Sequence, residues 1–360
     1  MLNTRAHISA LLAAMALALA LAGCVNFGPE PTPQEDNTIG FQTVVGLPDV
    51  VRAGKQLVYP TDRPFAATAY WMPRDYFWDQ SKNDLAEEYF AGVKVEWNES
   101  LGAWVANPKQ RWPYTHTLTF FAHSPWADNN GNQITNITIN TANDATIVTG
   151  WDTYDSATKG IDLMIAEVGE GQKDRHQDNT LGGVPTVFRH TLSQVQVIAG
   201  LASEYVVGGR TYNITLQRVE LRQIFTRGNY SSATSRWDAQ SQPKTIVLYD
   251  YRNEGTDGIV LDMSANQVGE PTLLLPQAHQ EGREGTQAEI FVEWYDSYNR
   301  AVESAIINLR QKFTNSYWGR GNYYTYYLTW DKGATSFIEF DKPIISADWM
   351  SGGDFVIEIE

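Results

Sequence analysis

Short stretches with apolar residues at every second position dominate the chain from Thr38 onward. Those that stand out most are Ile137–Ile139, Val195–Val197, Tyr212–Leu216, Ile290–Trp294 and Phe355–Ile359. A period of two, with many β-branched and aromatic residues, is typical of strands that bury one face. Clusters of Gly, Asn, Asp and Ser separate the stretches, as turns do. The pattern predicts an all-β protein built from β-sandwiches.

Two stretches leave room for a helix. Residues Asp84–Phe90 are compatible with a single helical insertion. Ala301, Ala305 and Leu309 recur at helical spacing, although the isoleucine pair between the last two suits a strand equally well. The flanking segments have strand patterns, which favours a strand for this second stretch.

A charged segment, Lys173–Asp178, interrupts the alternating pattern between Gly171 and Gly183. We expect the boundary between two tandem sandwiches to lie here, with a first domain over residues 38–183 and a second over residues 184–360. The chain of 360 residues is long enough for two domains of about 100–200 residues each. No repeat with a period of about 20–50 residues is visible, which argues against a solenoid or a propeller.

The first 23 residues have the order of a secretory signal peptide. Arg5 precedes an unbroken apolar stretch, Ile8–Ala20, and small residues lead from there to Cys24. The apolar stretch is short for a transmembrane helix, which makes that interpretation the weaker one. The sequence Leu21–Cys24 resembles a bacterial lipoprotein signal, in which the cysteine is acylated and becomes the first residue of the mature chain. This resemblance implies attachment to outer-membrane lipid through Cys24.

Residues 24–37 and the overall charge limit the partners of the mature chain. Three prolines and three acidic residues make Val25–Asn37 too polar to fold, so we expect a stiff tether. Without the signal peptide, 26 basic residues face 42 acidic ones, a formal net charge of −16. This excess of acid argues against nucleic acid as a partner and against direct binding to an anionic membrane surface. Cys24 is the only cysteine, so disulfides do not stabilise the domains.

No catalytic motif is apparent. The sequence lacks a Gly-x-Ser-x-Gly elbow, a His-Glu-x-x-His motif, a phosphate-binding loop and paired cysteines. His123 and His190 have no carboxylate or second histidine at chelating spacing, which favours structural histidines. Asp128, Asn130 and Asn132 resemble half of a calcium loop but lack its closing glutamate, which favours a hairpin turn. We therefore expect no catalytic residues, no cofactor and no metal.

Aromatic residues cluster within Trp71–Trp78 and within Tyr317–Trp330. Such clusters could stack on sugar rings, and a lipid-anchored surface protein that binds glycans is therefore the alternative function. However, alternate residues of a strand share one face, so packing in a core explains most of the second cluster.

Six short motifs follow one another across almost the whole mature chain. They are Leu118–Pro125, Asp162–Ala166, Val187–Val195, Leu273–Gln277, Gly321–Tyr326 and Ala347–Trp349. Their order and spacing resemble those of the fimbrillin family of Bacteroides-type bacteria, most of all its minor-fimbrium-like branch. The resemblance implies two tandem transthyretin-like, Greek-key sandwiches, export as a lipoprotein to the cell outer membrane, and assembly with other pilus subunits into a type V pilus.

The resemblance also implies a processing step near the start of the first domain. In fimbrillins an arginine-specific protease cuts between an arginine and an alanine after the first strand, and Arg52 and Ala53 stand at such a place. The alternation of Ile39, Phe41 and Val45 predicts that first strand. Its removal would leave an open sheet edge that a strand of another subunit could fill.

The last alternating segment is a candidate donor strand. Phe355, Ile357 and Ile359 would share one face, and their burial would contribute about 5–9 kcal/mol before ordering costs. Pairing of this segment within its own domain is an equally open interpretation, and Arg52 could be an ordinary loop arginine. The sequence thus predicts a non-enzymatic pilus subunit or accessory subunit that contributes to adhesion, with a surface glycan or protein as its receptor.

Overall fold

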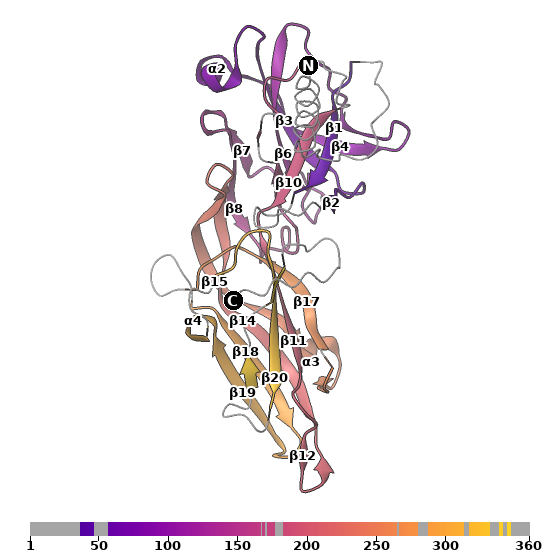
Figure 1. Ribbon diagram of the computed structural model, residues 1–360, viewed down its shortest axis with the longest axis vertical. Helices are drawn as coiled ribbons and strands as arrows, with labels where there is room; N and C mark the ends of the chain where they lie inside the picture. Colours follow the sequence, from indigo (N-terminus) through magenta and orange to yellow (C-terminus); the bar gives the residue numbers. More distant parts are fainter. Residues whose placement is uncertain are drawn as a thin grey trace, which may run out of the picture. The chain divides into compact units, whose positions relative to one another are not determined.

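The structure of the chain is a computed structural model, shown in Figure 1. It describes residues 37–46, 57–166, 168–169, 171–176, 183–264, 266–279, 287–312, 317–331, 338–340 and 344–346. Most of these residues lie in strands, which confirms the all-β fold class predicted from the alternating pattern. The strands form several sheets, in agreement with β-sandwich domains.

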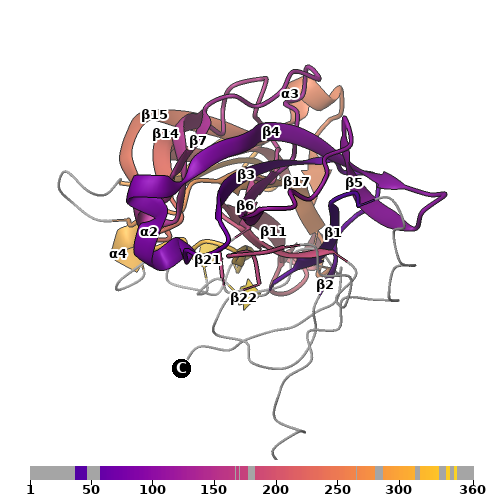
Figure 2. The same cartoon turned by 90° about the horizontal axis from the view of Figure 1, so that it is seen from above.

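Eight strands form the first sheet. They are β1 (Gly40–Val45), β2 (Leu57–Val58), β3 (Phe65–Pro73), β4 (Glu87–Asn98), β5 (Ala103–Asn107), β6 (His116–Ser124), β9 (Met164–Ala166) and β10 (Val184–His190). Their order is β10-β9-β6-β3-β4-β5-β1-β2, and β1 also pairs with β10. This additional pairing closes all of these strands except β2 into a ring, which Figure 2 views from above.

Residues at alternate positions of the strands fill the interior of this ring. Phe65, Ala67 and Ala69 of β3 and Phe120 of β6 belong to one buried cluster. Alternate residues of a strand point to the same side, so this spacing produces a continuous apolar interior. The alanines of β3 are small, which leaves space for the neighbouring phenylalanine rings.

Two further sheets follow in the chain. The seven-stranded sheet comprises β7 (Ile137–Asn140), β8 (Ala145–Asp152), β14 (Ile214–Ser231), β15 (Arg236–Asp250), β16 (Ile259–Val260), β18 (Glu289–Asp296) and β19 (Ala301–Asn308). The five-stranded sheet comprises β11 (Ser193–Leu201), β17 (Asn266–Leu274), β20 (Tyr323–Trp330), β21 (Ile338–Phe340) and β22 (Ile344–Ser346). Leu216 and Val292 of the larger sheet share one buried cluster with Val197 and Tyr326 of the smaller, as in a sandwich.

Apart from helix α2 (Trp78–Leu85), the remaining described elements are short. They are the hairpin strands β12 (Val206–Val207) and β13 (Arg210–Thr211), the helices α3 (Tyr251–Glu254) and α4 (Leu309–Lys312), and the 3-10 helix η1 (Thr141–Asn143).

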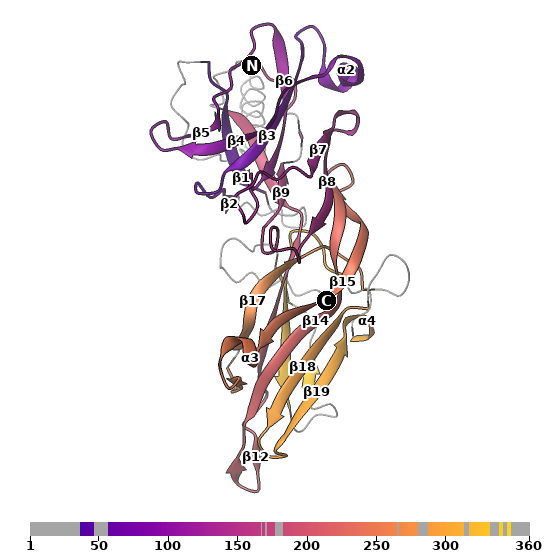
Figure 3. The same cartoon turned by 180° about the vertical axis from the view of Figure 1, so that it is seen from behind.

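Strand pairing crosses the residue at which we expected the domain boundary. β7 and β8 precede residue 183, yet β8 pairs with β14 of the seven-stranded sheet (Figure 3). β10 begins at residue 184, yet it pairs with β1 and β9 of the ring. A third buried cluster includes Ile165 of β9, Trp151 of β8 and Tyr230 of β14, so it links the ring to the second group of sheets. The division into residues 38–183 and 184–360 stays a prediction.

The helix expected within Asp84–Phe90 was placed too late in the chain. Helix α2 covers Trp78–Leu85, and strand β4 begins at Glu87. Residues Glu87–Phe90 pair with β3, and Phe90 packs in the interior of the ring. Ala301–Asn308 forms β19, in agreement with the strand that we favoured there. Among the described residues, no helix has the length and apolar character needed to cross a membrane.

Candidate functional site around the first strand

Strand β1 closes the ring because its backbone pairs on both sides. Residues Phe41–Val45 run parallel to Val184–Phe188 of β10. On the other side, the start of β1 pairs with β5 and its end pairs with β2, both antiparallel. Two hydrogen bonds extend the pairing beyond the strand, from Ile39 N to Gln110 O at 2.8 Å and from Gly46 N to Phe188 O at 2.7 Å. Removal of β1 would therefore open the ring and leave strand edges on β5 and β10 without their partner.

Three apolar side chains in and just before β1 occupy the interior of the ring. Ile39 and Val45 are fully buried and Phe41 is 3% exposed, so the structure places all three residues of the expected first strand in the core. The ring of Phe41 lies edge-to-face with those of Phe65 at 5.6 Å and Phe120 at 5.8 Å between centroids. Burial of these three side chains contributes about 5–9 kcal/mol at about 1.5–3 kcal/mol each.

A cluster of aromatic rings packs in the interior of the ring of strands beside β1. Tyr59 stacks on Phe188 with 4.8 Å between ring centroids, and Phe65 lies 5.2 Å from Phe188. The hydroxyl of Tyr59 shares a 2.6 Å hydrogen bond with Ser124 Oγ, and burial raises the pKa of this tyrosine above its usual value. Tyr59 lies in the short segment after β2, outside the alternating stretches, so the hydrophobic pattern does not predict its role.

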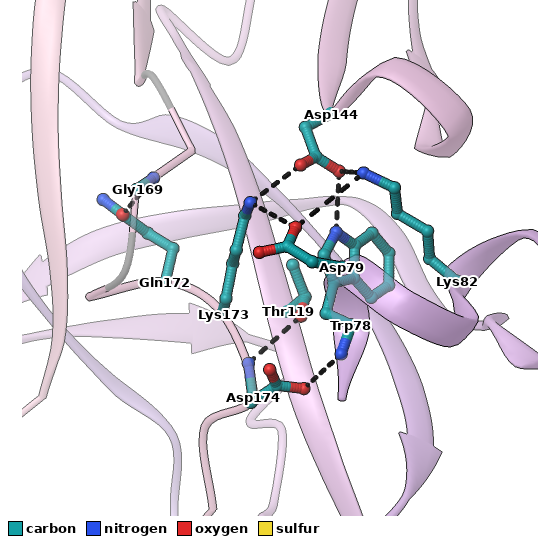
Figure 4. A network of polar contacts seen from close by, with 9 residues as sticks. All are labelled: Trp78, Asp79, Lys82, Thr119, Asp144, Gly169, Gln172, Lys173 and Asp174. Carbon is teal, nitrogen blue, oxygen red and sulfur yellow. Dashed lines mark hydrogen bonds and ion pairs between the residues drawn. The ribbon is translucent and has the colours of Figure 1, made fainter. Parts of the chain in front are cut away.

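A polar network joins three segments that are far apart in the sequence (Figure 4). Lys173 Nζ lies 2.7 Å from Asp79 Oδ1 and 2.8 Å from Asp144 Oδ2. Lys82 Nζ lies 2.6 Å from Asp144 Oδ1, and Trp78 Nε1 donates to the same oxygen at 2.7 Å. The segments are helix α2, the turn before β8 and the loop that leads towards β10.

The charges of this network compensate one another. Burial disfavours the charge of Asp144, but hydrogen bonds from Lys173, Lys82 and Trp78 outweigh it and hold the pKa of that carboxyl below its usual value. Burial also disfavours the charged form of Lys173, but its hydrogen bonds to Asp144 and Asp79 outweigh this and raise the pKa of its ammonium group. Both partners are thus held in their charged forms. Partly buried pairs of this kind stabilise a fold more than exposed pairs do.

Of three further candidates from the sequence, His190 and Asp128 have hydrogen-bond partners and His123 is buried. His190 Nδ1 lies 2.9 Å from Asp162 Oδ1, a contact that the fold creates between residues distant in the chain. His123 is buried, and burial lowers its pKa to about 4. The side chain of Asp128 accepts two hydrogen bonds from backbone amides of its own turn, as expected for a hairpin turn. Among the described residues, no group of three His, Cys, Asp or Glu side chains is placed to hold a metal ion.

The two aromatic clusters differ in how far their residues are buried. In the second cluster, Tyr324, Tyr326 and Trp330 are buried between the sheets. In the first, Trp78 is buried against Phe121. The most exposed aromatic residues of the two clusters are Tyr76, Phe77 and Tyr317.

The other candidate residues lie outside the described part of the chain. They are Cys24, Arg52, Ala53, Phe355, Ile357 and Ile359. Lipid attachment, proteolytic processing and strand donation at these residues stay predictions.

Comparison with known proteins identifies a family. A family model described as fimbrillin-like matches residues 74–343. A solved fimbrial protein from Bacteroides vulgatus superimposes with a TM-score of 0.55 at 16% identity, over 86% of this chain and 98% of the other. A candidate cell adhesion protein from Bacteroides uniformis gives a TM-score of 0.47 at 16% identity, over 87% and 99% of the two chains. The comparison with curated proteins finds no match.

Proposed function

Because the chain belongs to the fimbrillin-like family, we propose that it is a non-enzymatic subunit of a cell-surface fimbrium that contributes to adhesion. The fold that it shares with the fimbrial protein from Bacteroides vulgatus supports this proposal. The observation that carries the assembly mechanism is the position of β1, a short N-terminal strand that closes the ring through pairing on both sides.

In the proposed mechanism, an arginine-specific protease cuts the chain after Arg52. The peptide that carries Ile39–Val45 then has no covalent link to the rest of the ring, so it can leave. Its departure would expose the backbone edge of β10 and the apolar interior beside it, which an extended strand of another subunit would fill. Repetition of this head-to-tail contact does not close on itself, so it builds a filament.

We further propose that acylated Cys24 anchors the precursor in the outer membrane until this cut releases it. The partners are then outer-membrane lipid, the protease and other pilus subunits. The burial of Trp318, Tyr324, Tyr326 and Trp330 argues against glycan binding by the second aromatic cluster. In the first cluster, Tyr76 and Phe77 are exposed, and they are the residues on which the glycan-binding alternative rests. A surface glycan or protein remains the proposed receptor of the assembled fimbrium.

Treatment of the full-length protein with an arginine-specific protease tests this function. We expect a cut after Arg52 followed by ladders of SDS-resistant oligomers. Arg52→Lys should prevent both, because the lysine keeps the charge but removes the cleavage site. Arg63→Lys is the matched control, since Arg63 is a nearby partly exposed arginine, 3.8 Å from Asp162, and should leave the ladders unchanged. Ladders formed equally well by Arg52→Lys would contradict the processing step.

A second pair of variants tests the donor strand. Ile357→Asp should abolish the ladders but leave the cut intact, because a charge on the apolar face of the donor would have to be buried. Glu358→Asp introduces the same residue on the opposite face and should polymerise normally. Unchanged ladders from Ile357→Asp would rule out residues 354–360 as the donor.

A further inference from the structure

Gln172 connects two strands of the ring through hydrogen bonds to their backbones. Its side chain is buried, and Nε2 donates to Pro185 O of β10 at 2.7 Å. Its backbone carbonyl accepts from Phe120 N of β6 at 3.0 Å, and its Oε1 accepts from Gly169 N at 2.8 Å. This one residue therefore fixes the start of β10 against β6.

The start of β10 depends on this contact because β9 does not reach it. β9 pairs with Phe188–His190, whereas β1 pairs with Val184–Phe188. Among the described residues, β1 is thus the strand that pairs with Val184–Val187. The loss of β1 would leave this part of β10, one wall of the proposed groove, without a neighbouring strand.

Pro185 fits the position at which Gln172 binds. Phe188 O accepts a hydrogen bond from Gly46, so the polar groups of Phe188 point towards β1. In a strand, the backbone N–H and C=O of one residue point to the same neighbouring strand, and those of the next residue point to the opposite side. Pro185 is three residues before Phe188, so its carbonyl points away from β1. Proline has no N–H, and its carbonyl is therefore the one backbone group at this position that needs a partner.

The polar network holds the loop that carries Gln172 (Figure 4). Lys173, the next residue, binds Asp79 of α2 and Asp144 of the turn before β8. Asp174 Oδ1 accepts from Trp78 N at 2.9 Å, at the start of α2. None of these contacts involves β1, so they would persist after β1 leaves.

We propose that Gln172 is a positioning residue that keeps the first half of β10 in register while β1 is displaced. The incoming partner is then an extended strand that meets a preformed edge on β10, rather than one that must order the edge as it binds. Preorganisation of this kind lowers the entropic cost of binding. This inference rests on the proposed replacement of β1.

Hydrogen exchange on the full-length protein tests the proposal. Phe41→Ala loosens β1, and Gln172→Met removes the hydrogen bonds of the side chain at nearly constant volume. Backbone groups alternate in direction along β10, so the amides of Thr186 and Phe188 face β1. In the loosened background we expect Gln172→Met to raise their exchange rates about tenfold, as loss of a buried hydrogen bond predicts. In the native background, where β1 still pairs with β10, the increase should be at most about twofold.

Gln277→Met is the matched control. Gln277 is also a buried glutamine whose side chain bridges backbone groups, with bonds of 3.1 Å to Phe225 O and 3.0 Å to Leu275 O, but these partners lie in β14 and just after β17 and not in β6 or β10. Gln277→Met should leave the exchange rate of the Thr186 amide unchanged, both with native β1 and with Phe41→Ala. Equal effects of Gln172→Met in the two backgrounds, or none, would overturn the positioning role.

Two readouts keep this inference separate from the proposed function. If Gln172→Met does not fold, Lys173→Met is the substitute, because it weakens the loop without contacting β10. It should raise the exchange rate of the Thr186 amide, but by less than the roughly tenfold increase expected for Gln172→Met. No change with this variant in the loosened background would contradict the role of the network. If the exchange rates behave as expected but protease treatment gives no ladders, strand replacement is wrong and the positioning of β10 stands. Ladders without the exchange effect would refute the positioning role alone.

Discussion

Truncation of Phe41 tests how strongly β1 is held in the ring. Its side chain is almost fully buried and makes edge-to-face contacts with Phe65 and Phe120. Replacement of a buried phenylalanine by alanine costs about 3–5 kcal/mol, from lost transfer free energy and from the cavity. We expect Phe41→Ala to lower the free energy for opening β1 by at least about 3 kcal/mol, since the missing contacts all join β1 to its neighbours.

Hydrogen exchange resolved by residue measures this opening. A loss of about 3 kcal/mol corresponds to exchange about 100-fold faster in β1 and at the amides of β10 that face it. Phe77→Ala is the control, because Phe77 is 62% exposed and its truncation should change exchange less than about threefold. An increase below about tenfold in β1 would show that the contacts of Phe41 do not hold this strand in the ring. So would an equal increase at Val292, which lies in the core of the other sheets.

Three further predictions concern the rest of the molecule. Burial lowers the pKa of His123 and His279 to about 4, so below about pH 6.5 the unfolded chain binds more protons than the folded one. In urea titrations, the free energy of unfolding should therefore fall between pH 6.5 and pH 4, by up to about 3 kcal/mol per histidine. A free energy of unfolding that stays constant over this range would contradict this. Asp144→Asn should lower stability by about 1–3 kcal/mol in calorimetry, because it removes the shared partner of two lysines; an unchanged melting temperature would show that the network contributes little. Gly269→Ala should prevent or strongly weaken folding in expression and circular dichroism tests, since Gly269 has φ +67° and a Cβ there would meet a backbone carbonyl of β15. By contrast, Gly131→Ala, at φ +79° in open space, should cost only about 1 kcal/mol.

Local patterns were sufficient to predict the strands but not their pairing. The alternation of Ile39, Phe41 and Val45 predicts a strand with one buried face. The strand is present and these three residues are buried, but Val44 on its other face is buried too. Nothing in the local sequence indicates that it runs parallel to β10, because this pairing joins distant segments and depends on closure of the whole ring. For the same reason, the local pattern does not indicate that β10, which begins at residue 184, pairs with strands that precede it.

The residues of the polar network were missed for a related reason. Lys173 begins the charged segment Lys173–Asp178 and Gln172 precedes it, and charged segments are usually solvent-exposed. Their partners on α2 and before β8 come close only in the folded chain. Helix α2 was misplaced because tertiary contacts decide both of its ends, through burial of Trp78 and through the pairing of β4 from Glu87 onward.

The fate of β1 after proteolysis decides whether a strand of another subunit replaces it. Native mass spectrometry of the full-length protein, before and after treatment with an arginine-specific protease, would follow the peptide that ends at Arg52. The account predicts that assembled species lack this peptide and contain two or more copies of the remaining chain. A cut monomer that keeps the peptide bound through β1, with no assembled species at any concentration tested, would contradict it.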